Sequence, residues 1–141
     1  MEWFPEVLVT AVAVQIACQL FKLVLYSVKD RRFELRYLFT AGGIPSAHSA
    51  FVTALATAIG IRTGITSDAF AIAAVFSAIV IYDAFRLRGH VQHHAQILNR
   101  LVLRPAGEEP VSEMIGHSIP EIATGMLFGG GISAVVTVVF G

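Results

Sequence analysis

Four apolar stretches, each close to the length that spans a bilayer, constrain this chain more than any other feature. They cover roughly residues 4–28, 45–65, 68–85 and 119–140. A helix of about 20 consecutive apolar residues crosses the hydrocarbon core of a membrane. Charged residues make up only 14% of the chain, whereas a soluble domain needs about 25% to cover its surface. The sequence therefore predicts an all-α integral membrane bundle of about four transmembrane helices, built as one domain over residues 1–141.

The stretch 45–65 differs from the other three because polar side chains interrupt it. These are His48, Ser49, Thr53 and Thr57. Small residues allow close helix contact, and hydroxyl groups bond across helices in a membrane. We therefore expect this helix inside the bundle, away from lipid. In the last stretch, Gly125 and Gly129 predict close packing, either within the bundle or against a second copy in a homodimer.

Basic residues gather in two of the loops between these stretches. Eight of the ten lie in the first or third loop: Lys29, Arg31, Arg32, Arg36, Arg86, Arg88, Arg100 and Arg104. By the positive-inside rule these loops face the cytoplasm, and both chain termini face outside. The expected location is a bacterial plasma membrane. The net charge of zero gives no indication of a nucleic acid partner.

The third loop also contains apolar residues at helical spacing. They are Val91, Ala95, Leu98 and Val102. This pattern predicts a short amphipathic, interfacial helix. Three histidines of the same loop, His90, His93 and His94, include a pair spaced four apart, as metal ligands often are. No acid or cysteine completes the set nearby, so we interpret them as part of the surface helix.

The predicted topology brings unusual polar residues to one membrane face. They are Lys22 in the first helix, His48 at the start of the second, Asp83 and Arg88 at the end of the third, and His117 and Glu121 at the start of the fourth. Ionisable residues near hydrocarbon are expensive and tend to be functional. We therefore expect a functional site at the cytoplasmic end of the bundle.

The start of the second helix has features of a phosphate-binding site. A helix N-terminus offers free backbone N–H groups and the positive end of a dipole. Gly43 just upstream allows close approach of the backbone, and Ser46 adds a hydroxyl beside the N–H of Ala47. His48 lies one residue deeper. The alternative is an ordinary helix start with a packed histidine.

The other polar residues also have two interpretations. His117 and Glu121 share a helix face, and a carboxylate on one imidazole nitrogen raises the basicity of the other. The alternative is a structural hydrogen-bonded pair. Arg88 beside Asp83 either forms an ion pair at the membrane interface or binds phosphate through two parallel hydrogen bonds. For Lys22, the default is an ammonium group that extends toward the headgroups.

Nearly the whole chain resembles the divergent, bacterial-and-plant branch of the type 2 phosphatidic acid phosphatase and vanadium haloperoxidase superfamily. The matching residues are Lys22, Gly42-Gly43-Ile44-Pro45-Ser46-Ala47-His48-Ser49-Ala50, Val52-Thr53-Ala54-Leu55-Ala56-Thr57, Tyr82-Asp83-Ala84, Arg88, Leu98-Asn99-Arg100-Leu101, and Gly116-His117 with Glu121.

The resemblance implies a lipid-phosphate phosphatase that uses histidine chemistry and needs no metal or other cofactor. His117 would attack phosphorus and become phosphohistidine, Glu121 would orient it, and His48 would protonate the leaving group. The phosphate oxygens would be held by Lys22, Arg88, Ser46 and the N–H of Ala47. Asp83, Arg31 and Gly43 would support the site.

Two departures from the main superfamily leave other functions open. Where that superfamily has Ser-Arg before its nucleophilic histidine, this chain has Pro110-Val111-Ser112, and no Arg-Pro follows Lys22 at the usual spacing. Hydrolysis of a phosphomonoester, or of a pyrophosphate, in a lipid is the expected activity. The first alternative is a catalytically inactive protein that binds lipid headgroups or acts as a scaffold. The second is a metal-dependent hydrolase that uses Asp83, Glu121 and the histidines.

Overall fold

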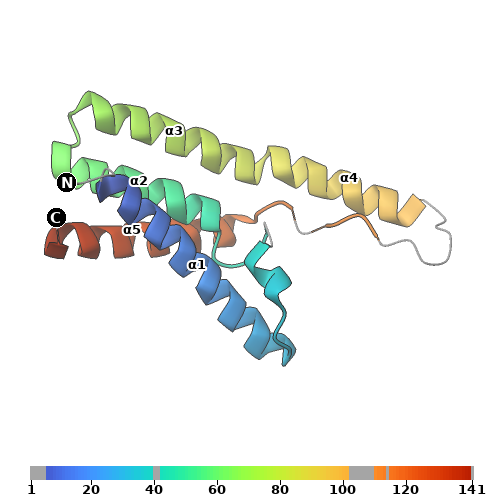
Figure 1. Ribbon diagram of the computed structural model, residues 1–141. Coiled ribbons are helices and arrows are strands. Elements are labelled where there is room, and N and C mark those ends of the chain that lie inside the picture. The colour runs from blue at the N-terminus through green and yellow to red at the C-terminus, as the bar shows by residue number, and fades with distance from the viewer. Residues whose placement is uncertain (1–5, 40–41, 102–109, 114, 141) are drawn as a thin grey trace.

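The computed structural model describes residues 6–39, 42–101, 110–113 and 115–140 (Figure 1). Its helices are α1 (Glu6–Asp30), η1 (Leu35–Phe39, a 3-10 helix), α2 (Ala47–Thr63), α3 (Asp68–Phe85), α4 (Leu87–Leu101) and α5 (Ile119–Phe140). The described residues contain no strand, which confirms the all-α prediction. Ser67 caps α3 as its sequence position indicates, because its side chain accepts a hydrogen bond from the backbone N–H of Phe70.

Three helical stretches are long and apolar enough to cross a membrane: Glu6–Asp30, Asp68–Leu101 and Ile119–Phe140. The prediction of an integral membrane helical bundle is confirmed. The remaining helix, α2, has only 17 residues and is the one expected inside the bundle. It contacts α1, α3 and α5, so the other helices surround it.

The backbone of α2 is hydrogen-bonded by hydroxyl groups from both sides. The Oγ of Ser77 in α3 donates to the carbonyl of Val52 at 3.0 Å. The Oγ of Ser133 in α5 donates to the carbonyl of Ala54 at 2.7 Å. Both serines are buried. Each hydroxyl thus satisfies its own polar group and ties a neighbouring helix to α2.

The glycines of α5 allow this helix to lie directly on α2. A Cβ atom at Gly125 would come within 2.4 Å of the carbonyl oxygen of Ser46, and one at Gly129 within 2.1 Å of that of Ala50. No side chain fits at such distances. The close contact predicted from the glycine spacing is therefore made within the bundle.

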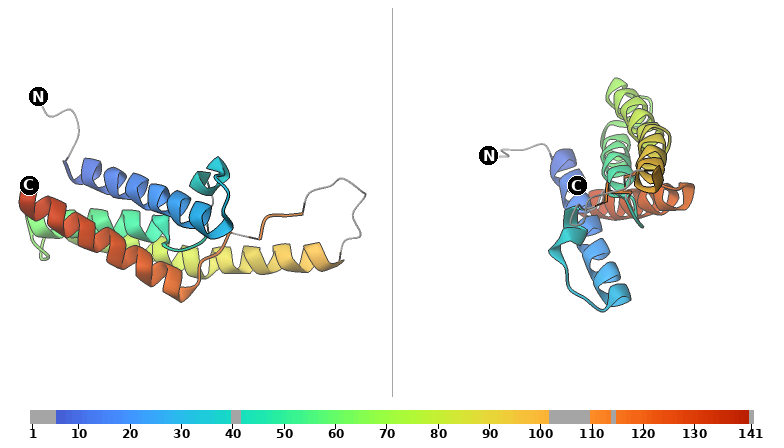
Figure 2. Two further views of the ribbon diagram at one scale, coloured as in Figure 1. Left: turned by 90° about the horizontal axis from the view of Figure 1, so that it is seen from below. Right: turned by 90° about the vertical axis from the view of Figure 1, so that its right-hand side faces the viewer.

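The helices α1, α2, α3 and α5 alternate in direction, so their ends collect at two opposite sides (Figure 1). Glu6 at the start of α1 forms an ion pair with Arg62 near the end of α2, and α5 also ends on this side (Figures 1 and 2). The starts of α2 and α5 and the end of α3 lie at the opposite side. The helix predicted in the third loop is present as α4. It continues the direction of α3 (Figure 1), and its placement on a membrane surface stays a prediction.

Candidate active site

His117 and Glu121 are joined at the start of α5 by the way this helix is capped. Glu121 lies three residues after Ser118, and its Oε2 accepts the backbone N–H of Ser118 at 3.0 Å. This back-bond is half of the capping box that glutamate makes in a first helical turn. The same oxygen lies 3.1 Å from Nδ1 of His117. Helix capping therefore fixes the carboxylate that holds the imidazole.

The pairing determines which nitrogen of His117 is available. An ionised carboxylate only accepts hydrogen bonds, so Nδ1 carries the proton and the lone pair remains on Nε2. The residue is 5% exposed. Its Nε2 is buried and has no hydrogen-bond partner in the described part of the chain. Because unpaired buried polar atoms are costly, such an atom points to a functional site.

The surroundings of His117 favour its neutral form. Burial lowers the pKa of His117 below its ordinary value of 6.5, and the positive charges of Lys22 and Arg88 lower it further. The hydrogen bond and charge of Glu121 oppose this shift by raising the pKa. The net direction is downward, so at neutral pH the imidazole keeps a free lone pair.

Lys22 lies inside the bundle rather than at the headgroup level. Its side chain is completely buried in α1, so the expectation that it extends toward the membrane surface is wrong. Its charge acts on Glu121 and on both His48 and His117. A buried ammonium group is costly unless other groups compensate it. Its position beside the two histidines supplies positive charge to the predicted site.

His48, Arg88 and Asp83 form a chain of contacts between α2, α4 and α3. The Nε of Arg88 lies 3.1 Å from Oδ2 of Asp83, and its Nη1 lies 3.4 Å from Nδ1 of His48. A guanidinium group only donates, so Nδ1 of His48 is the acceptor and a neutral His48 carries its proton on Nε2. Arg88 thus forms the ion pair with Asp83 and the contact with His48 at the same time.

Ser46 forms hydrogen bonds at the start of α2 through both its side chain and its backbone. Its hydroxyl caps α2 by accepting the N–H of Ser49 at 3.3 Å, and its own N–H donates to the carbonyl of Glu121 at 2.9 Å. Ser46 is fully buried, and Ala47 is 1% exposed. The hydroxyl of Ser46 thus caps α2, whereas its backbone N–H joins the start of α2 to the first turn of α5. Its contact with a phosphate stays a prediction.

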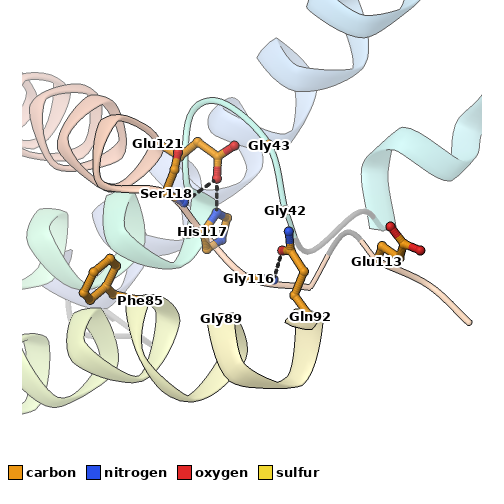
Figure 3. A pocket seen from close by; sticks show the side chains of 10 residues that line it. All are labelled: Gly42, Gly43, Phe85, Gly89, Gln92, Glu113, Gly116, His117, Ser118 and Glu121. Carbon is orange, nitrogen blue, oxygen red and sulfur yellow. Dashed lines mark hydrogen bonds and ion pairs between the residues drawn. The ribbon is translucent and has the colours of Figure 1, made fainter. Parts of the chain in front are cut away.

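A cavity of about 390 Å³ opens beside the His117–Glu121 pair. Its lining residues are Gly42, Gly43, Phe85, Gly89, Gln92, Glu113, Gly116, His117, Ser118 and Glu121 (Figure 3). Lys22, His48 and Arg88 are not among these lining residues. Gly43 has a φ of 93°, and a Cβ there would come within 2.4 Å of the Tyr26 hydroxyl. Its predicted supporting position beside the site therefore requires glycine.

The remaining predicted residues are exposed, and none of them lines this cavity. Arg31 is exposed beyond the end of α1, which points away from the starts of α2 and α5 (Figure 1). The histidines of α4, His90, His93 and His94, are exposed. Among the described residues, no three His, Cys, Asp or Glu side chains are grouped so that they could hold a metal ion.

Comparison with known proteins identifies the family of this chain. Residues 5–132 match the model of the divergent PAP2 family. The chain belongs to this family. It is 30% identical over 142 residues, or 89% of either chain, to a Bacillus subtilis (strain 168) protein described as "Uncharacterized membrane protein YuiD". No solved structure matches the chain. Family membership and the apolar helices together identify a PAP2-related integral membrane protein.

Sequence reasoning missed the residues with which this PAP2-related chain holds its His117 segment. Residues 110–113 and 115–117 run back along α4 (Figure 1). Asn99 pairs with Val111, donating to its carbonyl at 2.9 Å and accepting its N–H at 3.0 Å. Gln92 accepts the N–H of Gly116 at 3.0 Å. Because Gln92 and Asn99 are seven residues apart, they share one face of α4, a spacing that was visible in the sequence.

Proposed function

We propose that this protein is a membrane phosphatase that hydrolyses a lipid phosphomonoester, or a lipid pyrophosphate, through a phosphohistidine on His117. The observation that carries the proposal is the buried, unpartnered Nε2 of His117 on an imidazole whose Nδ1 is held by Glu121 at 3.1 Å. This is the arrangement of an activated nucleophile whose orienting group fixes its tautomer. Family membership supports the same chemistry.

The reaction has two steps. His117 takes up and releases the phosphoryl group, and His48 transfers the protons. In the first step, Nε2 of His117 forms a bond to phosphorus while the bond from phosphorus to the ester oxygen breaks, and His48, protonated on both ring nitrogens in the substrate complex, gives one proton to that oxygen and becomes neutral. In the second, His48 takes a proton from water, the water oxygen bonds to phosphorus, and the bond to Nε2 breaks. Inorganic phosphate and the lipid alcohol are the products.

Lys22 and Arg88 supply the positive charge that phosphoryl transfer needs. Both act on His117 and His48, and fixed cations stabilise the charge that develops on the phosphoryl oxygens. In the free protein, Arg88 discourages a second positive charge on His48 because the two groups are 3.4 Å apart. A bound phosphate dianion would offset the charge of Arg88, which favours protonation of His48 when substrate is present.

We further propose that the site faces the cytoplasm of a bacterium and that both termini lie outside. Eight of the ten basic residues lie in the first and third loops, which flank the site. The described ends of the chain, Glu6 and Phe140, lie at the opposite side of the bundle (Figure 1). Reporter fusions at Gly141 test this orientation, and a cytoplasmic C-terminus would overturn it.

Purified protein in detergent tests the proposed activity directly. The substrates are para-nitrophenyl phosphate and a panel that contains phosphatidic acid, phosphatidylglycerol phosphate and isoprenyl phosphates. We expect hydrolysis that EDTA does not inhibit and vanadate does, because vanadate adopts the five-coordinate geometry of phosphorus during transfer. His117→Ala should be inactive. Wild-type hydrolysis by a folded His117→Ala protein would rule out the mechanism, and loss of activity in EDTA would favour a metal-dependent hydrolase.

One observation favours a second candidate, a protein that binds phosphorylated headgroups without hydrolysing them. Arg88 is engaged by Asp83 and His48, and it does not line the cavity beside His117. Absence of turnover across the lipid panel, together with saturable binding of phosphatidic acid vesicles that His117→Ala weakens, would establish this candidate.

A further inference from the structure

Gln92 of α4 is held with its carboxamide nitrogen toward the cavity beside His117. The backbone N–H of Gly116 donates to its side-chain oxygen at 3.0 Å. Because a backbone N–H can only donate, this bond identifies the oxygen of the carboxamide. The NH2 group is therefore on the other side, where Figure 3 shows the nitrogen directed toward Gly42. Both Gln92 and His117 line the cavity.

Apart from Gln92, Ser118 and His117, the lining residues of the cavity have no side-chain donor when the carboxylates are ionised. Four of its lining residues are glycines, and two others, Glu113 and Glu121, are carboxylates. Ionised carboxylates cannot donate to a phosphoryl oxygen. The carboxamide of Gln92 does donate, and it carries no charge that would repel Lys22 or Arg88. The same wall contains the buried, unpartnered Nε2 of His117.

We infer that Gln92 is a substrate-binding residue whose NH2 group donates a hydrogen bond to a phosphoryl oxygen of the ester that His117 attacks. This inference rests on the proposed function. Gln92 adds an uncharged donor from α4 to the positive charges of Lys22 and Arg88. Gln92 is hydrogen-bonded to Gly116, and His117 is the next residue in the chain. The donor and the nucleophile are therefore held in a fixed position relative to each other.

A purely structural role of Gln92 makes a different prediction, and two substitutions separate the roles. Gln92→Glu keeps an oxygen that accepts the N–H of Gly116 but removes the donor. Gln92→Met has a similar size and removes both functions. If Gln92 only positions Gly116, Gln92→Glu behaves as wild type and Gln92→Met fails. If it binds the phosphoryl group, both variants fail.

A third variant controls for the added negative charge. Gln96 lies one turn further along α4 and is absent from the cavity wall. Gln96→Glu adds the same charge nearby without touching Gly116. Raising the salt concentration screens an effect that acts at a distance, whereas a lost hydrogen bond persists.

The measurement is vanadate affinity of the full-length protein in detergent, by titration calorimetry and by inhibition of para-nitrophenyl phosphate hydrolysis. We expect Gln92→Glu and Gln92→Met to weaken vanadate binding by roughly 10- to 100-fold, the usual effect of a hydrogen bond to a charged group. Gln96→Glu should stay within about twofold of wild type at moderate salt. Melting temperatures establish that each variant is folded.

Three results would overturn the inference. Wild-type vanadate affinity in Gln92→Glu, with a loss in Gln92→Met, would reduce Gln92 to a positioning residue. If Gln96→Glu loses as much vanadate affinity as Gln92→Glu, and high salt restores the affinity, then the added negative charge causes the loss. If the wild-type protein neither binds vanadate nor hydrolyses any phosphate ester, the proposed function falls as well, and this outcome is distinct from the other two.

Discussion

The Oε2 atom of Glu121 accepts hydrogen bonds from two neighbours at once, Nδ1 of His117 at 3.1 Å and the N–H of Ser118 at 3.0 Å. Helix capping and control of the imidazole tautomer therefore depend on one carboxylate oxygen. Glu121→Gln keeps the shape but can present an NH2 group to Nδ1, which favours the wrong tautomer. We expect the turnover rate to fall roughly 10³- to 10⁴-fold in this variant.

The matched control for Glu121→Gln is Asp68→Asn, which removes one exposed carboxylate at the first turn of α3, on the far side of the bundle. Steady-state hydrolysis of para-nitrophenyl phosphate by both variants decides the question. A Glu121→Gln enzyme that is folded and as active as Asp68→Asn would show that the His117–Glu121 bond is structural.

The dependence of activity on pH follows from the electrostatics of His117. Protonated imidazole cannot attack phosphorus, so kcat/KM falls as the pH drops through the pKa of His117, which burial places below 6.5. The bond to Glu121 raises this pKa, so Glu121→Gln should lower it and move the acidic limb of the profile to lower pH. Para-nitrophenyl phosphate is the suitable substrate, because ionisation of the phosphate itself affects both enzymes equally. An acidic limb that moves to higher pH would contradict this account.

Asn99 offers a test of how the segment before His117 is positioned. Its side chain makes a two-bond pairing with the backbone of Val111 and also donates to Oε1 of Glu113 at 2.6 Å. Asn99→Leu removes all three bonds and should lower kcat roughly tenfold, because His117 loses its fixed approach. Gln96→Leu on the same helix is the control. A change confined to melting temperature, with kcat intact, would limit Asn99 to a stabilising role.

Sequence patterns predicted the helices correctly because apolar runs and capping residues are local features of the sequence. The bounds of α3 and α5 agree with their apolar stretches, since Ser67 caps α3 and the apolar runs end where the helices end. The gathering of Lys22, His48, Arg88, His117 and Glu121 followed from topology, since antiparallel helices of equal span return to the same side. These features needed no knowledge of side-chain contacts.

Features that depend on long-range pairing were beyond the sequence patterns. The roles of Gln92 and Asn99 arise only because residues 110–113 and 115–117 return along α4, and no periodicity in that segment predicts its path. Ser46 shows a related limit. Its hydroxyl is equally suited to a cap or a phosphate, and only the packing of the helices shows that it is buried and caps α2.

The glycine face of α5 gives a paired stability prediction. A Cβ at Gly129 would come within 2.1 Å of the carbonyl of Ala50, whereas one at Gly131 would meet nothing within 4 Å. Gly129→Ala should therefore destabilise the bundle by about 1–3 kcal/mol through overpacking. Gly131→Ala should stabilise it by up to about 1 kcal/mol, because alanine is the better helix former. Thermal unfolding in detergent compares the two, and equal melting temperatures would mean that α5 does not lie on α2 as described.

The contact between His48 and Arg88 leads to a prediction about leaving groups. In the free protein, Arg88 lies 3.4 Å from Nδ1 of His48, and His48 becomes an acid when bound phosphate offsets the charge of Arg88 and Nδ1 takes up a proton. The imidazolium then gives the proton on its Nε2 to the leaving group. A lipid alkoxide needs that proton, whereas para-nitrophenolate is stable without it. His48→Gln should therefore slow hydrolysis of lipid phosphates roughly 10²- to 10⁴-fold and affect para-nitrophenyl phosphate far less. A series of aryl phosphates should show a steeper dependence on leaving-group basicity in the variant.

Arg88→Lys completes this test, because it keeps the charge but not the planar fork that contacts Asp83 and His48 together. We expect partial loss of activity with lipid phosphates and with para-nitrophenyl phosphate, because the guanidinium group of Arg88 also stabilises the charge on the phosphoryl oxygens. Arg86→Lys is the control, because Arg86 is an exposed arginine at the junction of α3 and α4. If His48→Gln loses the same factor with lipid phosphates and with para-nitrophenyl phosphate, then His48 does not act on the leaving group. The histidine would then join Arg88 in binding phosphate, and the proton for the lipid alcohol would come from solvent.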